Sequence, residues 1–311
     1  MFWLPVALAA YFILAIVNLL DKFLVDNVIK NSRAYAFAAC SLGAFILVLS
    51  PWFLVWPGWS LFFYNIFNGF IFAVAIWSLY ASLRRGEASR ILVFVGGMTP
   101  IFSLTLSLLL FKESFNMSEW VGMAFMLLGV LLIAFLPVSR SYLARVFAKL
   151  GFRQDFKVGG IWIALLSSFA YALYFISTKN AYGLQPFMSA FIWTRLGAAL
   201  AVSLFLLKPS DRSAIWQLFS RSTPGGNKAL IIFNQAFGAV GFILQNYAVF
   251  LGSVVIVNSL QGVQYAFLLI ISTILAILAP KLLRESFSWK IMTQKSIAVI
   301  AIIIGLYFIA L

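Results

Sequence analysis

Long apolar segments, separated by short polar links, limit the folds open to this sequence. Between residues 81 and 136 the chain passes a basic turn, an apolar segment over 91–111, a polar turn and another apolar segment over 120–136. A helix of about 20 residues, rising ~1.5 Å per residue, crosses the ~30 Å hydrocarbon core of a bilayer. Each of these segments therefore predicts a membrane-spanning helix.

Apolar segments and short polar links alternate through the whole chain of 311 residues, of which 64% are hydrophobic and 10% are charged. Soluble proteins carry about a quarter charged residues, so the composition predicts an all-α integral membrane protein, multi-pass in the plasma (inner) membrane. The predicted spans cover residues 2–20, 34–55, 61–83, 91–111, 120–136, 161–182, 186–207, 229–251, 253–279 and 291–311.

The two halves of the chain repeat one another weakly. Gly86 aligns with Gly252, Gly96 with Gly262, and the turn at 112–115 with the turn at 284–287. We therefore predict two five-helix repeats, over 1–137 and 159–311. Because five spans is an odd number, the repeats must be inverted relative to each other. The basic segment 138–158 between them is predicted to be an interfacial amphipathic helix, and a solvated loop is the alternative.

The distribution of basic residues predicts an orientation. Of the 22 Lys and Arg residues, 19 lie in the links after predicted spans one, three, five, seven and nine or, for Lys295, just past the last of these links, and two lie on the other side. The positive-inside rule places the basic side in the cytoplasm and both termini outside.

The two halves share several motifs: the acidic turns Phe111-Lys112-Glu113 and Leu283-Arg284-Glu285 and a glycine-bearing final helix, with a Gly-Glu-Ala-Ser segment at 86–89 in the first half. With these motifs the chain resembles the ten-helix EamA-like branch of the drug/metabolite transporter (DMT) superfamily. The resemblance implies a central cavity walled by helices one, three, four, six, eight and nine. Family members commonly have cytoplasmic termini, whereas the charge count favours the reverse, and we follow the count.

Several of these spans carry polar side chains in stripes that lipid would not accommodate. The alternative to substrate binding is hydrogen bonding between neighbouring helices. Gly96-Gly97 before Pro100 predicts a kink with close packing, or else an unwound turn that exposes backbone groups. The neutral candidates for substrate binding are Asn234, Gln245, Asn258, Gln261, Gln264, Tyr265, Tyr171, Tyr174, Asn68 and Asn18.

Charged groups inside the spans are few. All eight acidic residues fall at or beyond the ends of the predicted spans, so we expect no carboxylate within the membrane to carry a proton or to select cations. Arg195 lies nine residues past Pro186, about 13 Å along a helix, and needs backbone carbonyls, water or an anionic substrate group as a partner. We include it among the substrate-binding candidates. Lys179, near the end of its span, is expected to extend to the interface.

The residue inventory disfavours catalysis. There is no histidine, one cysteine and no paired carboxylates, so we expect no metal, no cofactor and no enzymatic activity. The net charge is +14, and most of the basic residues lie in the links between apolar spans, which favours contact with anionic lipid over nucleic acid. The sequence predicts a secondary transporter or exporter of a small organic metabolite, uncharged, zwitterionic or anionic, that acts as a monomer or homodimer. A flippase for a lipid-linked sugar and a lipid-modifying membrane enzyme are the alternatives.

Overall fold

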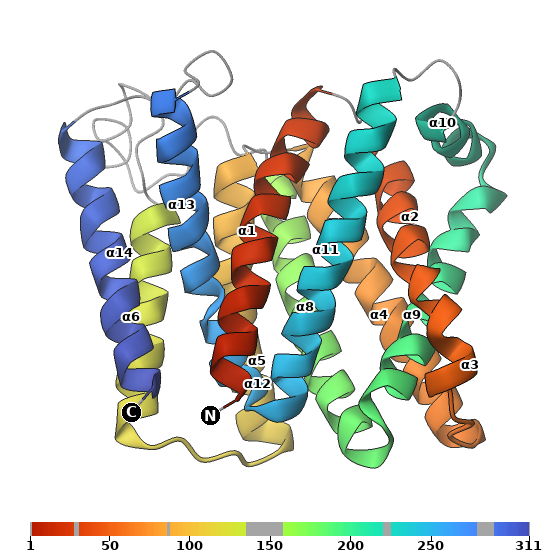
Figure 1. The fold of residues 1–311 in the computed structure, drawn as a ribbon, viewed down its shortest axis with the longest axis horizontal. Helices are drawn as coiled ribbons and strands as arrows, with labels where there is room; N and C mark the ends of the chain where they lie inside the picture. The colour runs from red at the N-terminus through yellow and green to blue at the C-terminus, as the bar shows by residue number, and fades with distance from the viewer. Residues whose placement is uncertain are drawn as a thin grey trace.

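The computed structural model describes residues 2–27, 31–85, 88–134, 158–219, 225–278 and 289–310, and the regular structure of these residues is entirely helical. In chain order the helices are α1 (Trp3–Asn27), α2 (Ser32–Gly43), η1 (Ala44–Leu49), α3 (Ser50–Phe53), α4 (Trp59–Leu83), α5 (Ala88–Leu110), α6 (Met117–Ala134), α8 (Val158–Leu184), α9 (Phe187–Ser203), η2 (Leu204–Leu207), α10 (Pro209–Phe219), α11 (Gly225–Leu251), α12 (Val254–Ser259), α13 (Gln261–Leu278) and α14 (Trp289–Ala310). The long helices stand side by side in one bundle (Figure 1).

Each predicted span coincides with a helix or with consecutive helices, as α2, η1 and α3 do for the second span. Within the part of the chain that the structure describes, six segments are long and apolar enough to cross a membrane, and four helices contain shorter apolar stretches. The all-α membrane architecture is therefore confirmed, while the count of ten crossings stays a prediction. Apolar side chains also cover the outside of the bundle, as on α4, where Phe63 is 61% exposed and Phe67 is 60% exposed.

Local sequence signals explain where several helices begin. The side chain of Asn31 caps α2 by accepting hydrogen bonds from the backbone N–H groups of Arg33 and Ala34. At the start of α6, Asn116 and Glu119 each accept a hydrogen bond from the other's backbone N–H, at 2.8 Å in both cases. Before α4 the chain turns at Gly58, whose φ of 84° favours glycine.

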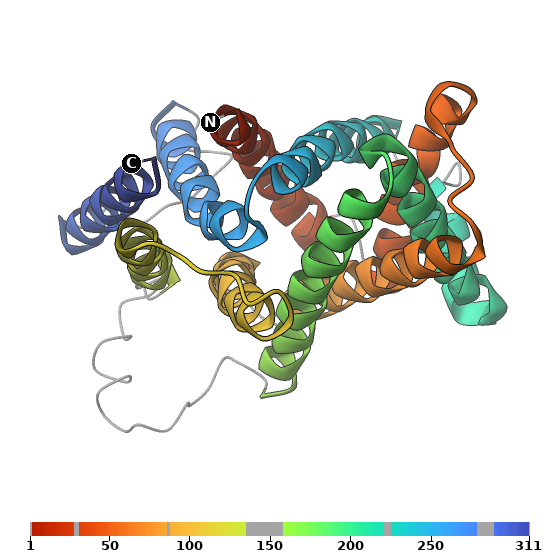
Figure 2. The same cartoon turned by 90° about the horizontal axis from the view of Figure 1, so that it is seen from below.

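The first half of the described chain, residues 2–134, packs on the second half, residues 158–310 (Figures 1 and 2). Helix α4 packs on α8 and α9, α1 on α11 and α13, α5 on α8 and α12, and α6 on α14. The third long helix of each half thus lies on the first long helix of the other half, which is the pairing expected from two repeats of one fold. The repeat boundaries themselves stay a prediction.

Both ends of the described chain lie at one end of the bundle, and α10 lies at the opposite end (Figure 1). Helix α10 belongs to one of the basic links, so the bundle places this link on the side away from the termini. The predicted linker 138–158 lies outside the described residues except for Val158, which begins α8, and residues 86–87 and the acidic turn at 283–285 also lie outside them.

Candidate functional site

The polar stripe of α11 lies against α1. Gly238 and Gly241 bring α11 close to the Val17 and Leu14 side chains of α1. The Gln245 Nε2 atom donates to the Tyr11 hydroxyl at 3.3 Å, and that hydroxyl donates to the Val257 carbonyl oxygen of α12 at 2.6 Å. One hydroxyl of the first half therefore joins two helices of the second half.

One carboxylate is buried in the same packing surface. Asp21 is only 8% exposed, and it accepts hydrogen bonds from the Tyr35 hydroxyl and, at 2.7 Å, from Asn234 Nδ2. Asp21 lies at the end of the apolar stretch Trp3–Asp21, as predicted, but its side chain is buried in the helix packing. The reason is that α1 continues to Asn27, so that Asp21 is packed between helices and is not part of a polar link.

Residues of α12 and α13 meet α5 in a second polar contact. The Asn258 Nδ2 atom donates to the Ser103 hydroxyl at 2.9 Å, while Asn258 Oδ1 is buried without a partner. The Tyr265 hydroxyl donates to the Leu92 carbonyl oxygen. The Tyr265 ring packs against Gly96, where any side-chain carbon would overlap it.

Helix α5 continues through Gly96 and Pro100 without an unwound turn. The predicted ninth span, in contrast, is interrupted between α12 and α13.

Arg195 is 5% exposed and is surrounded by aromatic rings. Its guanidinium carbon lies 4.2 Å from the ring centroid of Phe72, 4.3 Å from that of Phe242 and 4.7 Å from that of Phe191. Its Nη2 atom lies 3.5 Å from the Tyr174 hydroxyl, and its Nε atom is buried without a partner. The partner of this charge is thus an aromatic cage, a possibility that the sequence analysis did not include.

Helix α8 contributes tyrosines to the same region. Tyr174 is fully buried and donates to Asn246 Oδ1 of α11 at 3.0 Å. Tyr171 is half-buried, and its ring centroid lies 6.3 Å from that of Phe72. Of the predicted site residues, Tyr174 and Arg195 are therefore in direct contact.

Amides of α4 are buried near the loop between α8 and α9. Asn65 accepts a hydrogen bond from Gln185 Nε2 at 3.0 Å, and its own Nδ2 atom has no partner. Both side-chain polar atoms of Asn68 are buried without a hydrogen bond. An unpaired buried polar group costs about 1–3 kcal/mol, so a hydrogen bond from a polar ligand to these amides would be favourable.

The remaining candidates lie on the same helices without joining these contacts. Gln264 is 3% exposed on α13, Gln261 is half-buried at the start of α13, and Asn18 is half-buried on α1. The predicted residues thus form separate contacts. Asn234 and Gln245 contact residues of α1, Asn258 and Tyr265 contact residues of α5, and Tyr174 contacts Arg195.

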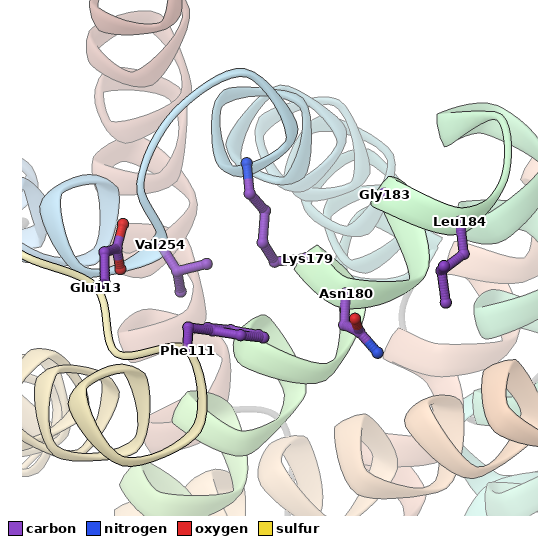
Figure 3. A pocket seen from close by; sticks show the side chains of 7 residues that line it. All are labelled: Phe111, Glu113, Lys179, Asn180, Gly183, Leu184 and Val254. Carbon is purple, nitrogen blue, oxygen red and sulfur yellow. The ribbon is translucent and has the colours of Figure 1, made fainter.

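A pocket of 440 Å³ opens at the end of the bundle where the termini lie, and it is lined by Phe111, Glu113, Lys179, Asn180, Gly183, Leu184 and Val254. Figure 3 shows Glu113 and Phe111 on one side of this opening and Leu184 on the other. The Lys179 Nζ atom donates to the carbonyl oxygens of Val249, Phe250 and Gly252 at 2.8–2.9 Å. It thereby satisfies the C-terminal end of α11.

Two of these features were absent from the sequence analysis for identifiable reasons. The span predicted over 2–20 stopped at Asp21, although apolar residues resume at Phe23, and this resumption was the available signal. No signal in the sequence pairs Lys179 with a helix end 70 residues away. Among the side chains that the structure describes, no group of three His, Cys, Asp or Glu residues could hold a metal ion.

Comparison with known proteins agrees with this architecture. The model of the EamA-like transporter family matches residues 1–135, which is almost the whole first predicted repeat. The uncharacterized transporter YdfC of Bacillus subtilis (strain 168) is 34% identical over 110 residues, which are 34% of this chain and 30% of that protein. This chain therefore matches less than a third of the length of that relative.

A solved crystal structure with a TM-score of 0.63 covers 97% of this chain and 93% of its own chain at 15% identity, which shows a shared fold alone. The family match and the relative together support membership of the drug/metabolite transporter superfamily. They support a multi-pass membrane protein of the transporter class.

Proposed function

We propose that the protein is a secondary transporter that moves a small organic metabolite across the plasma membrane by alternating access. The observation that carries this proposal is the set of neutral polar side chains buried between the two halves. Gln245 and Asn258 come from the second half, and each meets a hydroxyl of the first half, on Tyr11 and Ser103. Contacts of this kind can be exchanged for contacts with a polar substrate when the halves rock apart.

The hydrogen bonding of these groups is incomplete in the closed arrangement. Asn258 Oδ1 and Asn234 Oδ1 are buried and have no hydrogen-bond partner. A substrate hydroxyl or amine that reached either oxygen would remove a penalty of about 1–3 kcal/mol. The interruption between α12 and α13 lies at Leu260, two residues after Asn258, and broken helices are a common location for substrate sites in transporters.

The charge of the substrate is inferred from Arg195. A buried guanidinium, surrounded by rings but with a free Nε atom, favours an uncharged, zwitterionic or anionic metabolite over a cation. The working unit in this proposal is a monomer or homodimer.

A thermal-shift screen of the purified protein tests the proposal. A metabolite that binds the folded state raises the melting temperature, so neutral, zwitterionic and anionic compounds are compared with cations. For any compound that binds, Asn258→Leu should weaken binding at least about tenfold, because the substrate loses a hydrogen-bonding partner.

The matched control for this screen is Phe63→Leu on the outer surface of α4, which should bind the compound normally. If only cations stabilise the protein, or if Asn258→Leu binds the compound as tightly as the unmodified protein, the proposed site is wrong.

A further inference from the structure

The proposed transport cycle does not account for Asp21, a carboxylic acid buried in the bundle. Asp21 lies six residues before the end of α1, about 9 Å inside the helix. It is 8% exposed, in a chain whose acidic residues otherwise belong to links or helix ends. A carboxylate that is ionised in such a place is costly unless it is paired or can take up a proton.

The hydrogen bonds of Asp21 connect both halves of the protein. Its Oδ1 atom accepts from the Tyr35 hydroxyl of α2 and from Asn234 Nδ2 of α11. Gln235 Nε2, also on α11, donates to the Tyr35 hydroxyl at 3.0 Å. Any change in the charge of Asp21 therefore acts at the contact between the first half and α11.

The groups that face Asp21 from the neighbouring helices are uncharged. They are Tyr35 on α2, Tyr80 on α4, Asn234 and Gln235 on α11 and, with a weaker electrostatic interaction, Tyr171 on α8.

The basic residue of α2 is engaged elsewhere. Arg33, two residues before Tyr35, forms an ion pair with Asp211 at 2.8 Å. Among the side chains that the structure describes, no Lys or Arg nitrogen lies within 4.0 Å of the Asp21 carboxylate. Neutralisation by a proton would reduce the cost of burial.

The hydrogen-bonding balance of the cluster also favours a proton. Asn234 donates a hydrogen bond from Nδ2 to Asp21, and the Asn234 Oδ1 atom is buried without a donor. An ionised carboxylate only accepts hydrogen bonds, whereas a protonated one also donates. Proton uptake therefore adds a donor to a cluster in which a buried acceptor lacks one.

We propose that Asp21 is a proton-binding site, which holds a proton while α1 and α11 are packed together and releases it to water when this contact opens. The proton adds to a carboxylate oxygen from water and returns to water, and no other group changes. The link to substrate movement depends on the proposed transport function, but proton binding itself does not.

Infrared difference spectroscopy of the purified protein in lipid measures the site without a substrate. On acidification from about pH 9 to about pH 5, the carbonyl stretch of a protonated carboxyl group should appear in the unmodified protein and should be missing in Asp21→Asn. Glu119→Gln removes a carboxylate at the start of α6 and should retain the Asp21 band. If the Asp21→Asn difference spectrum overlays that of the unmodified protein, the proposal is overturned.

Tyr35→Phe provides a second test that leaves Asp21 in place. It removes a donor to the ionised carboxylate and should strengthen proton binding about tenfold, which moves the midpoint of the band by about one pH unit. The titration is repeated with choline in place of sodium. The proposal would be contradicted if the intensity of the Asp21 band changed with sodium concentration. It would also be contradicted if the band changed neither with pH nor in Tyr35→Phe. Because no substrate is used, this failure is distinct from a failure of the transport proposal.

Discussion

Arg195 and Lys179 show two ways in which this bundle holds a cation that forms no ion pair among the described side chains. Arg195 lies among the rings of Phe72, Phe191 and Phe242, whose faces attract positive charge. Lys179 donates to carbonyl oxygens at the end of α11, which the helix leaves without internal partners. In both cases the charge fixes contacts between helices, and Lys179 also lines the pocket at the terminal end.

Lys179→Met should destabilise the protein, because it leaves the α11 carbonyl groups without their charged donor. Hydrogen bonds that involve a charged group contribute about 1.5–3 kcal/mol, and we expect a loss of this size in the free energy of unfolding. Thermal denaturation in detergent measures it. Lys112→Met, at an exposed lysine in the link before α6, is the control and should change the melting temperature little. Equal melting temperatures for both variants would show that the carbonyl contacts of Lys179 add no stability.

The crossing of α4 and α9 depends on two glycines that face each other's backbones. A side-chain carbon at Gly69 would overlap the Thr194 carbonyl oxygen and the backbone at Ala198, and one at Gly197 would lie 2.5 Å from the Ile66 carbonyl oxygen. Small residues allow membrane helices to approach closely, so that van der Waals contacts hold the halves together.

Gly69→Ala and Gly183→Ala should therefore have opposite effects. The first forces α4 and α9 apart and should cost about 3 kcal/mol or more, because backbone atoms cannot rotate away as a side chain can. The second adds a carbon where nothing lies within 4 Å and should stabilise α8 by about 0.5–1 kcal/mol. Melting temperatures of the two variants, measured side by side, check this. A stable Gly69→Ala protein would rule out the close crossing.

The sequence was a good guide to the helices and a poor guide to their partners. Span length and apolar composition predicted every long helix, because the bilayer sets both. The stripe of Asn234 and Gln245 was also visible in the sequence, but its neighbour was not, since contacts such as Gln245 with Tyr11 join residues more than 200 positions apart. Periodicity alone does not fix the register between the halves. The aromatic cage of Arg195 was missed for the same reason, because its rings come from three helices.

The bundle as a whole has two ends of different character. The termini and the α5–α6 link lie at one end, and α10 lies at the other (Figure 1). The excess of basic residues belongs to the links on the α10 side, so the positive-inside rule predicts that this end faces the cytoplasm.

Cysteine labelling tests this orientation in a Cys40→Ser background. Ser114→Cys, in the α5–α6 link, should react with an impermeant thiol reagent added to intact cells. Ser213→Cys, on α10, should react only after the membrane is opened, because it is predicted to face the cytoplasm. Both positions are exposed, so access is limited by the membrane alone. The reverse pattern would place the termini inside.

The central claim is that the polar contacts between the halves open alternately to the two sides of the membrane. Ser103 is the most direct probe, because it is fully buried and receives the hydrogen bond of Asn258 across the halves. The decisive measurement is the rate at which Ser103→Cys, in the Cys40→Ser background, reacts with an impermeant maleimide in right-side-out and in inverted vesicles. The account predicts slow labelling from both faces, with none in the background protein. Labelling from one face only, or from neither, would contradict alternating access.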